Sequence, residues 1–181
     1  MKLIIPFLFC LFLGAIVNAQ IVKSTKRTSE HSTYVKGNNF EGVIFSEEYQ
    51  MPYVDNPTSE FRFTPSIEEI ELAEKILKEQ LPNINKGLNQ GKNLGPNINK
   101  KLSKYQRQYI GFITEDGERH IYISCNRQRY NLMDRIRGYS PPDDSWKTEF
   151  WIVFDGGSNH WNIKVNLDKK ELLDLNVNGV A

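Results

Sequence analysis

The last third of the chain carries the pattern that restricts its fold most. Large apolar side chains alternate there with polar ones, in the order Trp161, Asn162, Ile163, Lys164, Val165, Asn166 and Leu167. Because successive side chains of a β-strand point to opposite faces, this alternation predicts a strand with one buried and one exposed face. Runs with the same period lie at 104–114, 119–125 and 148–154. Short turns join antiparallel neighbours, so these runs predict an antiparallel meander.

An amphipathic helix is predicted ahead of these strands, from Pro65 to Leu81. Thr64 suits the N-cap and Pro65 the first helical position; alternatively, the residues from Ser66 to Glu69 form a capping box. One face of this helix is apolar and comprises Ile67, Ile70, Ala73, Leu77 and Leu81. We expect this face to pack against Trp161, Ile163 and Val165.

These elements predict an α+β fold in which one N-terminal helix packs on a four-stranded antiparallel meander. This order of elements is typical of the cystatin-like fold. The alternative is an NTF2-like cone, which normally contains more helix than this sequence predicts.

The first 19 residues have the pattern of a secretory signal peptide. Met1 and Lys2 precede an uncharged, mostly apolar run from Leu3 to Val17, and a small residue, Ala19, precedes the expected cleavage site. The run is shorter than the roughly 20 residues that a membrane span needs, and no later stretch is apolar enough to span one. We therefore expect a secreted or periplasmic protein that begins at Gln20 and has no integral membrane segment after cleavage.

The remaining chain divides into two parts. Residues 20–60 are polar and lack a clear period, which predicts a loosely attached extension with at most one docked strand near 40–45. Residues 61–181 are predicted to form a single α+β domain. Within it, the five residues at 82–86 recur at 96–100, and the asparagines and glycines around them predict a long loop over 82–103.

Charge and cysteine content exclude several classes of protein. The chain has 23 Lys and Arg against 22 Asp and Glu, and the numbers become equal once Lys2 is removed with the leader. Binding to nucleic acid depends on surplus positive charge, so we expect no nucleic-acid partner. Cys125 is the only cysteine left after cleavage and cannot form an internal disulfide, and we expect it to be buried and inert.

No pattern in the sequence indicates an enzyme. A nucleophile needs a base within reach, and Cys125 and His120 are an odd number of residues apart on one predicted strand, which places them on opposite faces. His160 approaches Cys125 only if strand pairing brings the two together. The histidines and acidic residues lack metal-ligand spacing, and no phosphate-binding loop precedes a helix. We therefore expect no catalytic site, no metal and no cofactor.

A binding surface is the remaining hypothesis. The sheet face opposite the helix is predicted to carry Trp151 together with Tyr105, Arg107 and Tyr109. Tyrosine, tryptophan and arginine are enriched where proteins contact their partners, so this face is a candidate site for a protein or glycan ligand.

The predicted topology also raises the hypothesis of a cysteine protease inhibitor. Cystatins insert a Gln-x-Val-x-Gly hairpin into the protease cleft, and the matching window here runs from Arg107 to Gly111. It retains the glycine but lacks the glutamine and valine in register, and Gly111 is predicted to lie within a strand. Inhibition is therefore the alternative to a plain binding function.

Four segments resemble a group of small secreted proteins of Bacteroidetes-type bacteria. These are Phe63–Ile70, Tyr105–Gly111, Asp155–Gly157 and the ending Val177–Ala181. The group has no assigned activity, so the resemblance implies export and a similar fold but no mechanism. The sequence as a whole therefore predicts an exported, non-enzymatic binding or accessory protein of unknown ligand.

Overall fold

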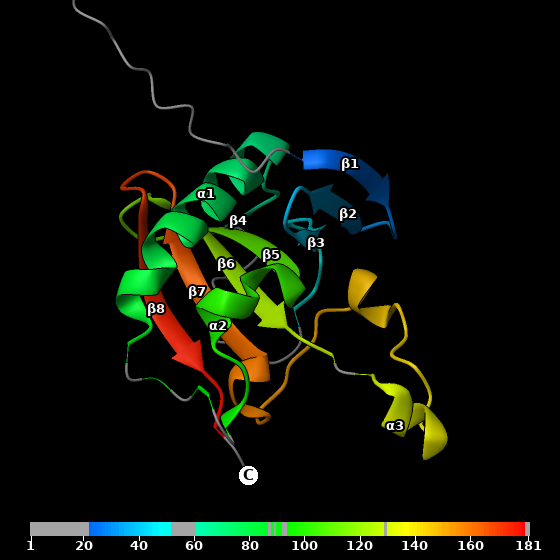
Figure 1. Cartoon of the computed structure of the whole chain (residues 1–181). Helices are drawn as coiled ribbons and strands as arrows, with labels where there is room; N and C mark the ends of the chain where they lie inside the picture. The colour runs from blue at the N-terminus through cyan, green and yellow to red at the C-terminus, as the bar shows by residue number, and fades with distance from the viewer. Residues whose placement is uncertain are drawn as a thin grey trace, which may run out of the picture.

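The computed structural model describes residues 22–51, 61–86, 88, 90, 91, 94–128 and 130–179, and contains one large mixed β-sheet (Figure 1). Its eight strands are β1 (Val22–Arg27), β2 (Ser32–Gly37), β3 (Glu41–Phe45), β4 (Arg62–Phe63), β5 (Gln106–Ile113), β6 (Arg119–Asn126), β7 (His160–Asn166) and β8 (Glu171–Val177). The strand order is β1-β2-β3-β5-β6-β7-β8, and β4 pairs with β5 beside β3. The expected residues 1–19 of the signal peptide lie outside the described part of the chain.

The predicted four-stranded meander is wrong, and with it the cystatin-like and NTF2-like topologies. Strands β5, β6 and β7 occur where the period of two placed them, and β5 to β8 pair antiparallel in sequence order. However, β1, β2 and β3 extend the same sheet, and β3 pairs parallel with β5. A parallel pair requires a long crossover, here the segment that contains α1, and this pairing leaves no local signal in the sequence.

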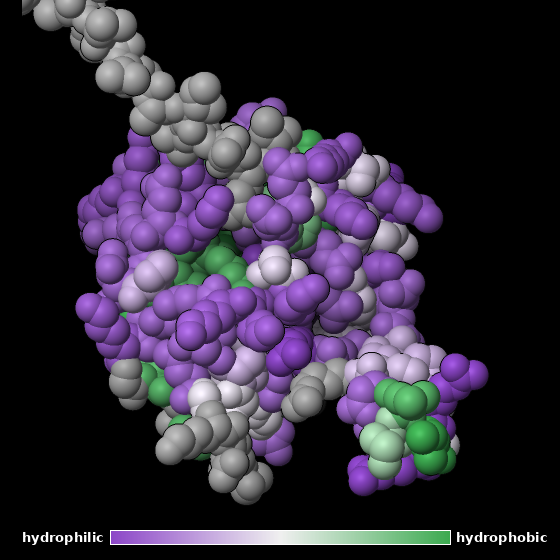
Figure 2. All heavy atoms as spheres, in the orientation of Figure 1, coloured by the Kyte–Doolittle hydropathy of each residue, from purple (hydrophilic) through white to green (hydrophobic). Residues whose placement is uncertain are grey.

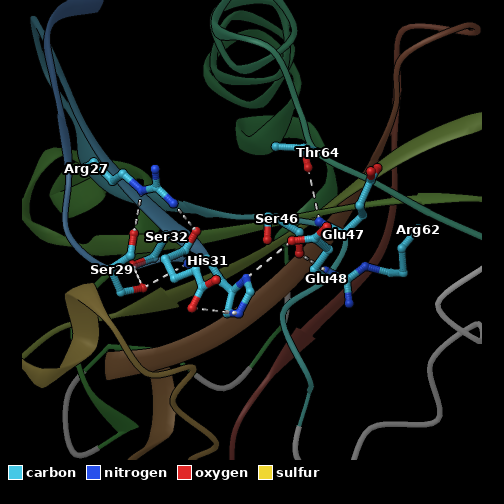
Figure 3. Close-up of polar contacts among 10 residues, drawn as sticks. Arg27, Ser29, His31, Ser32, Ser46, Glu47, Glu48, Arg62 and Thr64 are labelled. Atoms are coloured by element: carbon cyan, nitrogen blue, oxygen red, sulfur yellow. Dashed lines mark hydrogen bonds and ion pairs between the residues drawn. The ribbon is translucent and has the colours of Figure 1, made fainter.

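The N-terminal strands are joined to the rest of the sheet by a buried arginine as well as by backbone pairing. Arg62 of β4 donates a hydrogen bond to the carbonyl oxygen of Gly111 at 3.1 Å and another to that of Ser46 at 3.2 Å. Figure 3 draws Arg62 and Ser46. The backbone N–H of Ser46 donates in turn to His31 O at 2.9 Å. Described residues in 22–51 are therefore part of the folded sheet, and the expectation of a loosely attached extension does not hold for them.

Helix α1 (Ile67–Ile84) begins at the capping box that the sequence predicted. The Ser66 hydroxyl accepts from Glu69 N, and the Glu69 carboxylate accepts from Ser66 N, so two N–H groups of the first turn are satisfied. Thr64, the alternative cap, instead accepts a hydrogen bond from Glu47 N at 3.1 Å (Figure 3). The helix continues past Leu81 through Pro82 to Ile84.

The main core lies between α1 and one face of the sheet, which we call the inner face (Figure 1). Ile70 and Leu77 of α1 belong to the same buried cluster as Trp161, Ile163 and Val165 of β7. This confirms the expected contact between the apolar face of the helix and the alternating strand.

The repeated pentapeptide has a structural role in the segment after α1. Asn85 and Asn99 occupy the same position in the two copies, and their side-chain amides bind each other reciprocally at 2.7 and 3.1 Å. Asn85 caps the end of α1, while Asn97 caps the start of α2 (Ile98–Lys101). The two copies therefore hold the end of one helix beside the other.

A second, smaller core covers part of the opposite face of the sheet, which we call the outer face. Val43, Phe45 and Ile110 of the sheet pack there against Trp146 and Phe150. Trp146 lies in a short 3₁₀ helix (Ser145–Lys147) and Phe150 in the irregular stretch that follows it. We call residues 146–155 the strap. The predicted strand at 148–154 is therefore wrong, since this segment crosses the outer face and is not part of the sheet.

An arm, residues 130–145, projects from the body of the protein between β6 and the strap (Figure 1). It carries the short helix α3 (Leu132–Ile136), whose apolar residues Leu132, Met133 and Ile136 are exposed and form the apolar patch at the lower right of Figure 2. Among the described residues, no helix has the length and apolar character needed to cross a bilayer.

A buried ion pair joins α1 to the central strand β5. Arg107 Nε lies 2.8 Å from Glu74 Oε1, and both side chains are fully buried. The hydroxyl of Tyr109 donates to the same carboxylate oxygen at 2.9 Å. Burial raises the pKa of the Glu74 carboxyl, and Arg107 and the Tyr109 hydrogen bond oppose this rise. The remaining guanidinium nitrogens of Arg107 donate to the carbonyl oxygens of Tyr105 and Leu102.

We predict strong coupling between the two members of this pair. Arg107→Met and Glu74→Leu should each lower the free energy of unfolding by about 3–5 kcal/mol, because each leaves the other charge buried without its partner. The double variant should lose less than the sum of the two single losses by at least about 1 kcal/mol. Urea unfolding of the wild type, the two single variants and the double variant measures these free energies.

An exposed ion pair supplies the control. Lys164 and Asp174 are 2.9 Å apart on neighbouring strands, and both side chains are partly exposed. Lys164→Met should cost less than about 1 kcal/mol. Additive losses at positions 74 and 107 would show that the buried pair does not act as a unit.

Candidate functional site

The structure separates the four residues that the sequence predicted as a binding face. Tyr105, Arg107 and Tyr109 point to the inner face and are buried beneath α1 and its following segment, with exposed fractions of 1 % or less. Trp151 alone lies on the outer face, on the strap, and is partly exposed. These four residues therefore do not form one exposed surface.

The interior accepts these polar side chains because each has a partner. Arg107 and Tyr109 bind Glu74, and the hydroxyl of Tyr105 donates to Ser158 O at 2.6 Å. The period of two correctly placed Tyr105, Arg107 and Tyr109 on one face of a strand. Because these side chains are polar, the sequence predicted that they face solvent. That prediction is wrong, since Glu74, which binds both Arg107 and Tyr109 in the interior, lies on a helix distant in the sequence.

The candidate nucleophile and bases are also apart. Cys125 is buried in the core of the inner face, and burial raises the pKa of its thiol. His120 and His160 lie on the outer face, and the residue paired with Cys125 across β6 and β7 is Trp161. The prediction that Cys125 and His120 point to opposite faces is confirmed. Among the residues that the structure describes, no group of three His, Cys, Asp or Glu could hold a metal ion.

Two amide side chains of the sheet hold the strap in place. Gln108 of β5 donates from Nε2 to Trp146 O at 2.8 Å and Glu149 O at 2.7 Å, and its Oε1 accepts from Trp151 N at 2.9 Å. Asn178, just after β8, donates to Val153 O at 2.6 Å and Asp155 O at 3.1 Å. These bonds replace the strand pairing that residues 148–154 lack.

A groove lies between the strap and the outer face of β6, β7 and β8, with a volume of about 340 Å³. The aromatic residues Phe150, Trp151 and Phe154 border it on the strap side. Phe154 is 87 % exposed. The groove is therefore open to solvent and flanked by aromatic rings.

The sheet side of the groove carries a row of small polar side chains. Ser124, Asn162 and Asn176 stand directly opposite one another on the three neighbouring strands. The side chains of such cross-strand pairs lie next to each other on one face of the sheet. Neither Asn162 nor Asn176 makes a side-chain hydrogen bond with a described residue. Their donors and acceptors are therefore available to a ligand.

His160 of β7 also lines the groove. Its Nδ1 lies 2.9 Å from Asn126 Oδ1, and because Asn126 Nδ2 already donates to Ser124, this oxygen accepts from the histidine ring. Burial lowers the pKa of His160, although Asp155 opposes the shift. Burial also raises the pKa of Tyr122 to about 12. Both groups are therefore uncharged at neutral pH.

A second cavity of about 480 Å³ adjoins the first, and His160 lines both. Arg127, Tyr130 and Tyr139 also line the second cavity, where the base of the arm meets the body of the protein. Taken together, the two cavities are within the size range of sites that bind small molecules or short chains of them.

The sequence did not predict this groove, because one of its sides is formed by the strap and the other depends on how three strands pair. The alternation at 161–167 did place Asn162 on the exposed face of its strand. The strap has the same apolar alternation as a strand, so its position across the sheet was not predictable from residues 148–154. The row of Ser124, Asn162 and Asn176 depends on strand register, which no single segment encodes.

Comparisons with known proteins do not identify this chain: no protein-family model, no curated protein and no solved structure matches it. The resemblance to small secreted proteins of Bacteroidetes-type bacteria therefore stays a prediction.

We predict that Gln108 holds the strap. Gln108→Ala should lower the free energy of unfolding by about 2–3 kcal/mol, since it leaves three backbone groups of the strap without a partner. The amide of Trp151 should also exchange its hydrogen faster, which NMR or mass spectrometry measures.

Gln106→Ala is the matched control. Gln106 lies on the same face of β5 two residues earlier, and its Oε1 has no hydrogen-bond partner among the described residues. This change should cost less than about 1 kcal/mol and leave exchange at Trp151 unaltered. Equal effects of the two substitutions would contradict the anchoring role of Gln108.

Proposed function

We propose that this chain is an exported, non-enzymatic binding protein whose ligand occupies the groove between the strap and the outer face. The observation that carries the proposal is the row of Ser124, Asn162 and Asn176 on the groove's sheet side. The amides of Asn162 and Asn176 make no hydrogen bond with described residues, although they lie in a concave site with aromatic borders. Convergent polar groups beside aromatic side chains in a concave site are usual features of a binding site.

The position of the reactive side chains supports binding without catalysis. Cys125 is enclosed on the inner face, while His160 lies in the groove on the outer face. A nucleophile and its base must approach within hydrogen-bond distance, and the sheet itself separates these two. For the alternative function, protease inhibition, Gly111 would need to lie at an exposed hairpin tip. It lies within β5, where a Cβ atom would come within 2.5 Å of Phe63 O.

Export is inferred from the pattern of the first 19 residues, and this pattern also predicts the N-terminal residue of the exported protein. The cell envelope or culture medium of the source organism should contain a form that begins at Gln20, because signal peptidase cleaves after the small residue Ala19. N-terminal sequencing or intact mass spectrometry of that form measures this. A protein retained in the cytoplasm with Met1 or Lys2 at its start would contradict export.

The binding function is tested by thermal unfolding with ligands of several classes. Soluble oligosaccharides, a pool of short peptides, fatty acids and nucleotides are each added to the wild-type protein. A ligand that binds only the folded state raises the melting temperature, so at least one class should do so. Asn162→Leu and Asn176→Leu, which remove the amides at similar volume, should abolish the rise.

Asn83→Leu provides the control for this experiment, because Asn83 is an exposed amide on α1, on the other side of the sheet. It should leave the ligand effect intact. If no class raises the melting temperature, or if the groove variants respond as the wild type does, the proposed function is wrong.

A further inference from the structure

We infer that the ligand of this groove is an uncharged saccharide chain, an inference that rests on the proposed binding function and specifies its ligand. Three observations support it: no described residue that lines the groove is Asp, Glu, Lys or Arg, two asparagine amides there have no hydrogen-bond partner among the described residues, and the borders of the groove are aromatic.

The absence of charge is the first observation. Asp, Glu, Lys and Arg make up 25 % of the chain, yet none of the described residues that line the groove is of these types. His160 and Tyr122, the titratable residues there, are uncharged at neutral pH. A carboxylate, phosphate or ammonium group would lose its hydration in the groove without gaining an ionic partner, which costs several kcal/mol. The site therefore selects a neutral ligand.

The free amides match a ligand that both donates and accepts hydrogen bonds. An asparagine side chain offers two N–H donors and a carbonyl acceptor, and each hydroxyl of a sugar is itself a donor and an acceptor. Asn162 and Asn176 are cross-strand partners, so their Cβ atoms are about 5 Å apart. This spacing suits two amides that bind neighbouring hydroxyl groups of one ring or of two linked rings.

The aromatic border supplies the apolar part of the recognition. One face of a sugar ring presents C–H groups, which pack against the face of an aromatic ring. Trp151 is partly exposed, and Phe154 is 87 % exposed, at the groove. A ring that packs on either one removes apolar surface from water while its hydroxyl edge reaches the amides of the sheet.

The geometry favours a saccharide over a peptide and a chain over a single ring. Peptides that add to sheets bind through the backbone of a free strand edge. The sheet side of this groove presents a row of side chains, Ser124, Asn162 and Asn176, from one face of three paired strands. His160 lines both the groove and the second cavity, so a ligand longer than one sugar ring has room to extend past it, towards a cavity whose lining includes Arg127 and Asp134.

Isothermal titration calorimetry with defined probes tests the inference. The neutral probes are cello-, malto-, xylo- and chito-oligosaccharides of two to six rings; the charged probes are oligogalacturonate and heparin fragments; the peptide probe is a neutral hexapeptide pool. At least one neutral series should bind, with an affinity that rises from two to four rings. Its affinity should change less than twofold between 50 and 500 mM NaCl, because no ion pair forms.

Variants locate the binding and separate the two proposals. Trp151→Ala and Asn162→Leu should each weaken binding of the neutral probe at least tenfold, while Asn83→Leu leaves it unchanged. Asn176→Leu should act like Asn162→Leu, and because Asn176 is exposed, this second variant remains informative if Asn162→Leu destabilises the fold.

Each outcome has one meaning. Groove-dependent binding of a charged saccharide or a peptide, with no neutral saccharide bound, overturns this inference and keeps the binding function. Neutral saccharide binding that survives all groove variants, or no binding of any neutral series, also overturns it. A groove that binds no probe of any class overturns the binding function as well.

Discussion

The buried contact between Arg107 and Glu74 is the interaction on which the other parts of this structure depend. Arg107 lies on β5, the strand that pairs with β3, β4 and β6. Its guanidinium binds α1 through Glu74 and the segment after α2 through Leu102 O, and it lies 5.8 Å from the centroid of the Phe40 ring. A buried charge tolerates little displacement, because a lost partner leaves it unsolvated. One side chain thus fixes the helix, the loop segment and the N-terminal strands against the same strand.

The same strand organises the opposite face through the next residue. Gln108 points away from α1 and binds three backbone groups of the strap. Because side chains alternate along a strand, residues 107 and 108 control two different layers from adjacent positions. The helix packs on the inner face over the main core, whereas the strap covers only part of the outer face. The outer face therefore retains the groove, and its shape depends on how firmly β5 holds both layers.

The sequence predicted the local parts of this fold and missed the parts that depend on distant pairing. The period of two located β5, β6 and β7, and the residues from Ser66 to Glu69 predicted the start of α1, because these signals act over a few residues. The pairing of β3 with β5 joins segments about 60 residues apart, and no turn marks it. For the site, sequence placed Asn162 on an exposed face and Trp151 opposite the helix. It assigned Tyr105, Arg107 and Tyr109 to the surface, since Glu74, which neutralises Arg107, looks like any other acidic residue of an amphipathic helix.

The asparagine side chains differ in whether they make hydrogen bonds within the protein. Asn85 and Asn99 satisfy each other, Asn126 binds His160 and Ser124, and Asn178 binds two carbonyl groups of the strap. Each of these amides holds two segments together. Asn162 and Asn176 are directly paired across β7 and β8, yet neither side chain makes a hydrogen bond with a described residue. An asparagine lowers β-strand stability relative to β-branched residues, and two opposite each other increase that cost. Because these two amides lie at the groove together with Trp151 and Phe154, a ligand that binds them would offset this cost, which is why we propose the groove as the binding site.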